Sequence, residues 1–233
     1  MEKMRLAFLL CTIIFSLHAF NQTTSVKQPN CTEIKGLQTC DNSLIPENYT
    51  GIVLCCTNSK VITLRNYKNG KTDGLLRGWY ENGKLKFEGI NKEGEAQGIS
   101  KHWYENGQLK YESSYLNGKW NGLSKDWYEN GQLQSESNYK NGLNDGASKS
   151  WYENGQIDAE MNYKDGEFHG KQKGWYKNGQ LAFESFSIDG IDNGLSRQWY
   201  ENGQLSLEEN YLNGVLISSK CWDENGNLVQ CDQ

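Results

Sequence analysis

The chain has 233 residues and a formal net charge of −5, with 36% hydrophobic residues, 25 Gly, 8 Trp and 13 Tyr. A core buried on all sides would need more Leu, Ile and Val, whereas a sheet with one apolar face needs fewer. The acidic balance argues against general nucleic-acid binding, which needs a basic footprint.

Residues 1–19 have the pattern of a secretory signal peptide. Lys3 and Arg5 precede an apolar run over residues 6–17, and Ala19 is a small residue near a plausible cleavage point. The run is shorter than the roughly 20 residues that a membrane-spanning helix needs. A buried N-terminal strand or helix is the alternative. We expect an exported protein, secreted or periplasmic, whose mature chain has no transmembrane segment and carries 28 acidic against 22 basic residues.

Residues 20–54 are expected to form a small cysteine-containing cap. Six cysteines remain after residues 1–19: Cys31, Cys40, Cys55, Cys56, Cys221 and Cys231. An even number behind a secretion signal indicates disulfides. A bond between the neighbours Cys55 and Cys56 would strain the intervening peptide, so two pairing schemes remain among the first four cysteines. Either scheme ties the cap to the start of the following segment.

Residues 55–233 form an array of 24-residue repeats. Trp recurs at positions 79, 103, 127, 151, 175 and 199, and Tyr follows each one. A last copy, "WDENGNL", starts one residue early at Trp222, and "CCTNSKVITLRNYKNG" fits as a degenerate first copy. A fixed period of this size is typical of repeat architectures, in which each unit buries its apolar surface against the next.

Each unit carries two Asn-Gly turn signals, "YENG" and "YLNG" or "YKNG", at alternating spacings of 11 and 13 residues. Asn-Gly between runs of alternating apolar residues is the strongest short-range hairpin signal. Each unit is therefore two strands. We predict an all-β fold, an elongated antiparallel β-meander built from two-stranded repeats.

The register is predicted from the segregation of apolar and polar residues. A three-residue loop, with Gly107 as a left-handed bulge, pairs Trp103 with Leu109 and Lys101 with Tyr111. The same count through the second turn pairs Tyr111 with Leu123. This choice puts Leu123, Trp103, Leu109, Tyr111 and Tyr115 on one face, and Tyr104, His102, Lys110 and Glu112 on the other.

Two further expectations follow from the meander. A glycine follows each second turn and predicts a bulge that curves the sheet; the positions are Gly74, Gly98, Gly122, Gly146, Gly170 and Gly194. Because strands lie about 4.8 Å apart, the two ends of the array are tens of ångströms apart, beyond the reach of a disulfide. Cys221 and Cys231 can therefore pair only with each other or stay free. We favour the bond, with Cys221 opposite Val229.

The stretch "WYENGQLKYESSYLNGKWNG" resembles the variant MORN repeat of bacterial proteins, and the resemblance covers residues 55–231. It implies an elongated antiparallel sheet used for protein or lipid association. One bacterial branch is labelled as the antitoxin of toxin–antitoxin pairs, so the resemblance also implies an alternative role, neutralising a toxin by direct binding. An export signal departs from what a cytoplasmic antitoxin needs.

A basic residue stands two positions before each Trp, which suggests a binding face of alternating aromatic and cationic groups. The candidate residues are Arg77, Trp79, Lys101, Trp103, Lys125, Trp127, Lys149, Trp151, Lys173, Trp175, Arg197 and Trp199. The alternative is that the basic stems only cover neighbouring aromatic rings. We expect a protein partner before a glycan or lipid head groups.

The sequence gives no sign of catalysis. Glu recurs at positions 88, 112, 136, 160, 184 and 208, which could bind cations or form a solvated polar face. His102 and His169 occupy different positions in their units, and no phosphate-binding loop or zinc-ligand spacing occurs. We expect a non-catalytic binding or scaffold protein without cofactor or metal.

Overall fold

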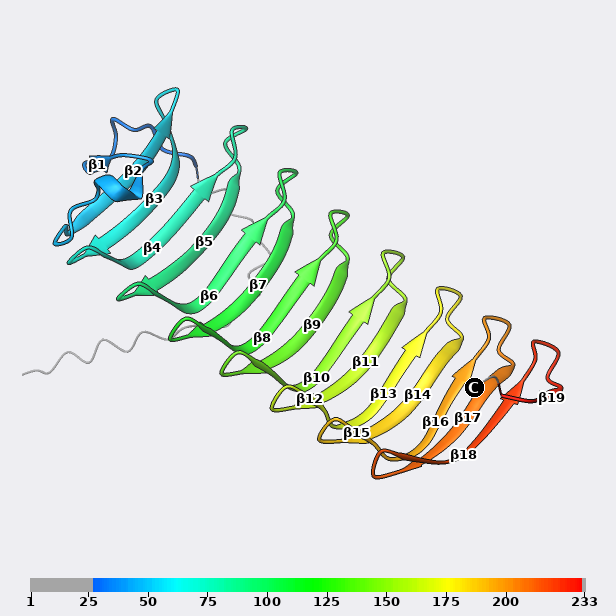
Figure 1. Ribbon diagram of the computed structural model, residues 1–233. Coiled ribbons are helices and arrows are strands. Elements are labelled where there is room, and N and C mark those ends of the chain that lie inside the picture. The colour runs from blue at the N-terminus through cyan, green and yellow to red at the C-terminus, as the bar shows by residue number, and fades with distance from the viewer. Residues whose placement is uncertain (1–26, 232–233) are drawn as a thin grey trace, which may run out of the picture.

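The computed structural model describes residues 27–231, in which β2 and the strands after it form an antiparallel sheet in chain order (Figure 1). The predicted signal peptide lies outside the described residues. A short cap holds β1 (Leu37–Gln38) and the 3₁₀ turn η1 (Asn42–Leu44), and β1 pairs with β2 in parallel. The predicted all-β meander with a disulfide-bonded N-terminal cap is therefore confirmed.

Every repeat supplies one strand before and one after its "YENG" turn. The strands are β2 (Gly51–Thr57), β3 (Lys60–Lys68), β4 (Lys71–Trp79), β5 (Leu85–Lys92), β6 (Glu95–Trp103), β7 (Leu109–Leu116), β8 (Lys119–Trp127), β9 (Leu133–Lys140), β10 (Leu143–Trp151), β11 (Ile157–Lys164), β12 (Glu167–Phe168), β13 (Gly170–Trp175), β14 (Leu181–Ile188), β15 (Ile191–Asp192), β16 (Gly194–Trp199), β17 (Leu205–Leu212), β18 (Val215–Trp222) and β19 (Leu228–Val229). The pairs β12/β13 and β15/β16 are single strands of the meander interrupted at a bulge.

The first turn of each repeat is the predicted three-residue loop. The Tyr104 amide donates to the Gln108 carbonyl at 2.8 Å, and the Gly107 amide donates to the Tyr104 carbonyl at 2.9 Å. Gly107 has φ +96°, in the left-handed region that favours glycine. Trp103 pairs with Leu109 as predicted.

The register then shifts by one residue, a change that the repeat pattern did not predict. His102 pairs with Tyr111 and Lys101 pairs with Glu112, because Lys110 is an extra residue on its strand. The predicted pairing of Lys101 with Tyr111 is wrong. Residues directly opposite each other on paired strands share a face, so Tyr111 lies beside His102 and Glu112 lies beside Lys101.

The second turn is a two-residue turn, not the three-residue loop that we predicted. Leu116 pairs with Lys119, and the turn residues Asn117 and Gly118 have φ +50° and +73°. Positive φ at both central residues defines a type I′ turn, whose twist matches that of the flanking strands. This turn and the bulge around Gly122 together pair Tyr111 with Asp126 rather than with Leu123.

The glycine that follows each second turn lies at a bulge, as predicted. In β8 the pairing moves from Tyr115–Trp120 to Ser113–Ser124, so extra residues are accommodated around Gly122. Gly122 has φ +107°, and an added Cβ would lie 3.2 Å from the Cβ of Ser114. Any other residue would be strained here, which explains why glycine recurs at this position.

These pairings give the sheet two distinct faces. The ion-pair face carries the Trp, Leu, Lys and Glu of each repeat, for example Trp103, Leu109, Lys101 and Glu112. The tyrosine face carries residues such as His102, Tyr111, Ser113 and Tyr115. The predictions that Trp103 and Leu109 share a face and that His102 lies opposite are confirmed. The predicted places of Tyr111, Tyr115 and Glu112 are wrong, because the one-residue bulge exchanges the faces beyond it.

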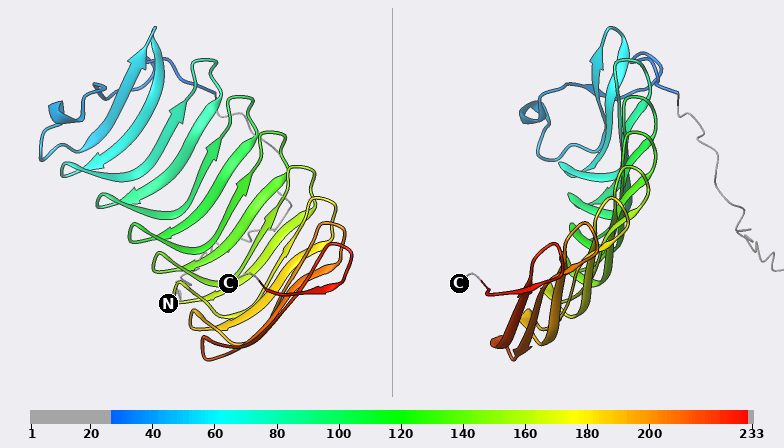
Figure 2. Two further views of the ribbon diagram at one scale, coloured as in Figure 1. Left: turned by 45° about the vertical axis from the view of Figure 1, so that its right-hand side comes forward. Right: turned by 90° about the vertical axis from the view of Figure 1, so that its right-hand side faces the viewer.

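The strands are bent along their length, so the ribbon is curved in cross-section (Figure 2). The buried polar side chains of the described residues, Ser113, Gln172 and Ser187, all lie on the tyrosine face. The turn η1 lies on the inner side of the bend (Figure 2), where Asn42 accepts a hydrogen bond from Arg65 of that face. The tyrosine face is therefore the inner side of the sheet.

The repeated Tyr and Asn of the "YENG" turns join each repeat to the next. The Tyr104 hydroxyl donates to the Trp127 carbonyl at 2.8 Å, and Asn106 Nδ2 donates to the Glu129 carbonyl at 2.9 Å. The same tyrosine bond is made by Tyr80, Tyr128, Tyr152, Tyr176 and Tyr200. These bonds explain why the same turn sequence recurs, because the Tyr and Asn of each copy bind the backbone of the following copy.

Removing one of these hydroxyls should loosen a single junction. We expect Tyr128→Phe to cost about 1 kcal/mol, the usual value of one hydrogen bond, because the ring stays while the 2.8 Å bond to the Trp151 carbonyl is lost. Thermal unfolding and amide exchange in β10 would measure the loss. Tyr163→Phe is the matched control, since the part of the chain that the structure describes offers no hydrogen bond to that hydroxyl. Equal losses in both variants would contradict the junction role.

The main hydrophobic cluster lies at the capped end. Cys31, Leu54, Val61 and Trp79 are buried together, with Leu85 and other partly buried side chains around them. Disulfides join Cys31 to Cys56 and Cys40 to Cys55, one of the two schemes left open by the sequence. Cys221 is bonded to Cys231, and Cys221 pairs with Val229, both as predicted.

Candidate functional site

The basic and glutamate ladders, which were predicted to lie on opposite faces, form one ladder on the ion-pair face. Lys101 pairs with Glu88 on β5 and with Glu112 on β7, so it stands between two carboxylates, whereas Arg77 at the capped end stands between Leu64 and Glu88. The Lys101 Nζ lies 2.8 Å from the Glu112 Oε2. Equivalent ion pairs are Arg77–Glu88, Lys125–Glu136, Lys149–Glu160, Lys173–Glu184 and Arg197–Glu208.

This ladder decides the electrostatics of the predicted binding face. Charges of opposite sign alternate from strand to strand, so the surface has no net cationic stripe. The side chains are about one-third exposed, and each such pair contributes about 0–1 kcal/mol. Repeated along the whole array, the pairs favour the observed register over a shifted one, because a slip would move each cation away from its opposing carboxylate.

The structure brings the twelve sequence-predicted site residues together on the ion-pair face, but they differ in exposure. Trp79 is only 5% exposed and belongs to the cap cluster. The later tryptophans, such as Trp127, are half-buried at the border of the ladder. Part of the predicted surface is therefore scaffold, and its accessible part runs from β6 to β16.

Reversing the charge of one glutamate tests whether the alternating charges stabilise the sheet. We expect Glu136→Lys to lower the free energy of unfolding by about 1–2 kcal/mol, because the introduced ammonium group would stand between Lys125 and Lys149. Urea unfolding at low salt measures the loss, and about 1 M NaCl should shrink it by screening. Glu136→Gln is the control, with a smaller loss. An effect independent of salt would contradict an electrostatic origin.

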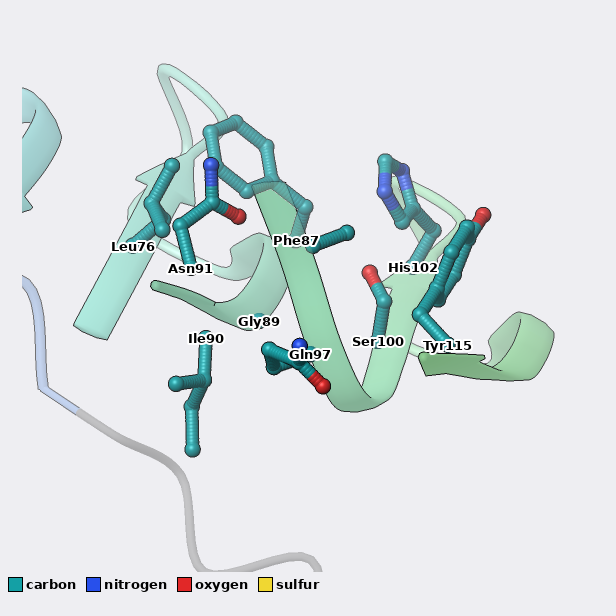
Figure 3. Close-up of a pocket in the computed structure, with 10 residues that line it drawn as sticks. Leu76, Phe87, Gly89, Ile90, Asn91, Gln97, Ser100, His102 and Tyr115 are labelled. Carbon is teal, nitrogen blue, oxygen red and sulfur yellow. The ribbon is translucent and has the colours of Figure 1, made fainter. Parts of the chain in front are cut away.

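The tyrosine face carries a shallow hollow near the capped end (Figure 3). Its volume is about 250 Å³, and Phe87, His102, Tyr115, Asn91 and Ser100 stand around it. The hollow exists because Gly89 has no side chain; an added Cβ would lie 3.2 Å from the Ser100 Oγ. Other repeats place a side chain at this position, for example Ser113 and Ser137.

His102 lies in an aromatic stack at the edge of this hollow. Its ring centroid lies 5.6 Å from that of Phe87 and 4.2 Å from that of Tyr111. Burial lowers the pKa of His102, and the charges of Lys110 and Lys86 lower it further. The imidazole is therefore neutral near pH 7 and offers one donor and one acceptor nitrogen.

The tyrosine face was not among the sequence-predicted sites. The signal that could have found it is departure from the repeat: Gly89 stands where several other copies have Ser, and His102 stands at a position that differs between copies. That signal was hidden because the wrong register placed His102 and Tyr111 on opposite faces.

The described residues offer neither a metal cluster nor a membrane-spanning helix. No cluster of three or more His, Cys, Asp or Glu side chains suited to a metal ion occurs in residues 27–231. Over the same residues, no helix has the length and apolar character needed to cross a bilayer.

Comparison with known families agrees with the geometry. The model of the family described as "MORN repeat variant" matches six stretches, residues 72–90, 96–117, 120–141, 144–165, 168–189 and 192–213. The match identifies the repeat family and gives no support to the antitoxin-labelled branch. No curated protein matches the chain. Because the six stretches cover more than half of the chain and coincide with the observed strand pairs, the chain belongs to the MORN repeat variant family.

Proposed function

We propose that this protein is an exported, non-catalytic scaffold that binds a partner through one face of its sheet. Three disulfides indicate that the chain folds in an oxidising compartment. Export through residues 1–19 and work in the periplasm or outside the cell fit that chemistry.

The observation that carries the proposal is how the repeated residues are used. The recurring Tyr and Asn bind the next repeat, the Lys and Glu bind each other, and the glycines permit the bulges. All of these tasks hold the sheet together and none performs a reaction. Apart from these structural contacts, the array offers a long one-layer sheet with two exposed faces, as repeat proteins that act as binding surfaces do.

The experiment uses the disulfide-bonded protein as immobilised bait and asks what happens to a bound partner. A partner captured from the source's extracellular or envelope fraction is purified and bound again in pure form. We expect saturable binding and a partner recovered with unchanged mass. Recovery of a cleaved or modified partner would contradict a non-catalytic role, and absence of any saturable ligand would contradict the binding role.

The aromatic and basic residues of the ion-pair face stay a proposed contact surface. Lys125→Gln with Lys149→Gln removes two cations from the face without placing like charges side by side in the ladder. A partner that uses these cations should bind the double variant more weakly. Glu136→Gln with Glu160→Gln is the matched control, because it breaks the same two ion pairs by removing their carboxylates.

A further inference from the structure

The internal repeats show which positions of the tyrosine face vary from copy to copy. On the ion-pair face every copy from Trp79 to Trp199 keeps Trp, a basic residue two positions earlier, and Glu nine positions later. On the tyrosine face the residue before the Trp changes from copy to copy: Gly78, His102, Asp126, Ser150, Gly174 and Gln198. Its cross-strand neighbour changes as well: Phe87, Tyr111, Ser135, Ala159, Phe183 and Leu207.

This contrast distinguishes repeat positions that hold the sheet together from positions that can give binding specificity. Constant positions make the contacts that every repeat needs, whereas the variable positions tolerate glycine, acid, amide and aromatic side chains in the same fold. The variable residues therefore make contacts particular to their own strand pair, such as Phe87 packed over Gly78, rather than the contacts that every repeat needs. They are the positions at which this chain can recognise something particular, and they lie together on the inner side of the bent sheet.

Aromatic side chains border this inner face on both sides between β5 and β9. Along the "YENG" side stand Phe87, His102 and Tyr111 in one stack. Along the opposite edge, at the two-residue turns such as Asn117–Gly118, Trp120 packs on Tyr139 with ring centroids 4.8 Å apart. The Trp120 Nε1 donates to the Tyr115 hydroxyl at 2.8 Å. Trp120 is 42% exposed, so its ring is available to a ligand. Tyr163 and Phe168 continue the second border towards β12.

The floor between the borders is made of small hydroxyl side chains. Ser113 bonds Ser124 at 2.6 Å, and Ser137 bonds Ser148 at 2.7 Å. A pair of hydroxyls that shares one hydrogen bond still has a second proton and further lone pairs. Ser124, Ser137 and Ser148 are half-buried rather than fully covered. The floor can therefore exchange hydrogen bonds with hydroxyl groups of a ligand.

The trough formed by this floor and its borders has charged side chains along one border, and one of them, Asp126, lies opposite Tyr111. Lys86, Lys110, Asp126 and Asp158 lie along the "YENG" border, and Ser135 and Ser150 donate hydrogen bonds to the two aspartates. Burial raises the pKa values of Tyr111, Tyr139 and Tyr163, so these phenols stay neutral. An acidic peptide or an anionic head group would find no cationic partner on the floor.

We propose that the trough on the tyrosine face, from the Phe87–His102 hollow along Trp120 and Tyr139, binds a neutral glycan chain. A pyranose ring presents C–H groups to an aromatic face and hydroxyl groups at its rim, which matches aromatic borders over a serine floor. One sugar unit is about as long as the strand spacing of about 4.8 Å, so successive rings can follow successive strands. This inference rests on the proposed binding function and names its ligand class.

The test measures binding of purified, disulfide-bonded protein to defined hexasaccharides by calorimetry. The neutral probes are cellohexaose, mannohexaose and xylohexaose, and hexagalacturonate is the anionic contrast. We expect saturable binding of at least one neutral probe and none of the anionic one. Trp120→Ala should weaken that binding about tenfold, as the loss of one aromatic contact predicts.

Leu123→Ser is the matched control, because Leu123 lies on the same strand, is 39% exposed and faces the ion-pair side. It should bind like the unaltered protein. Tyr139→Ala is a second trough variant and should weaken binding as Trp120→Ala does. Near-identical melting curves of Trp120→Ala, Tyr139→Ala and Leu123→Ser show that a loss of binding is not a loss of folding. Failure of every neutral probe, or equal binding by Trp120→Ala, would overturn the glycan proposal.

Different results would contradict the glycan proposal and the scaffold proposal. If no neutral hexasaccharide binds but the partner captured by the immobilised protein is a polypeptide that Trp120→Ala no longer retains, the scaffold function stands and the ligand class is wrong. If hexagalacturonate alone binds, the uncharged-floor argument is overturned.

Discussion

Trp79→Ala should cost about 3–5 kcal/mol, the usual loss when a buried Trp is truncated in a core. Trp79 is 5% exposed and packs with Leu54, Val61 and Cys31, so its removal leaves a cavity where the array joins the cap. Because repeat arrays unfold in parts rather than as one unit, the loss should appear as faster amide exchange in β2–β5. Exchange in β8–β11 should change little.

Trp127→Ala is the matched control in the middle of the array. Trp127 occupies the same position of its repeat but is half-buried and is not part of the cap cluster. We expect a clearly smaller loss, confined to β8–β10. Equal losses at the two sites would contradict the view that the cap holds the best-packed part of the molecule.

The double variant Cys31→Ala with Cys56→Ala should destabilise the capped end by about 3 kcal/mol. The bond closes a loop with a sequence separation of 25 residues, and a cross-link of this size restricts the unfolded chain by about that amount. Other anchors of the cap are the pairing of β1 with β2 and the second disulfide, Cys40–Cys55. Limited proteolysis should then release the residues before Cys40, while the Cys40–Cys55 bond keeps the rest of the cap on β2.

Cys221→Ala with Cys231→Ala is the comparison at the other end. Its bond spans only 10 residues and holds the two-residue strand β19 against β18. Its removal should fray β19 while the cap keeps its protease resistance. Loss of the cap in this variant would contradict independent behaviour of the two ends.

The sequence was a good guide wherever a repeated letter has a local cause. The 24-residue period predicted the meander, Gly107 predicted the three-residue loop, and the glycine after each second turn predicted the bulge. These features depend on the conformations that Asn and Gly allow within a few residues. For Cys221 and Cys231, the length of the array left a mutual bond or free thiols, and the predicted register favoured the bond that is observed.

Pairing between strands was predictable only in part. Our criterion, segregation of Trp, Leu and Tyr from polar residues, put Tyr111 with Trp103. The sheet instead aligns Lys101 with Glu112 and stacks Tyr111 on His102, with an extra residue at Lys110. The aromatic residues are divided between the faces, because a one-layer sheet exposes both and has no single apolar side to fill.

The amino-acid sequence by itself determined the fold class, the strand count per repeat and the family, since period and turn chemistry are local properties. Only the tertiary structure decided which residues share a face. A one-residue bulge is a small local change, but it exchanges every side chain beyond it because side chains alternate along a strand. That exchange neutralises the predicted cationic ladder with Glu112 and its equivalents and gathers the variable residues on the inner face around His102.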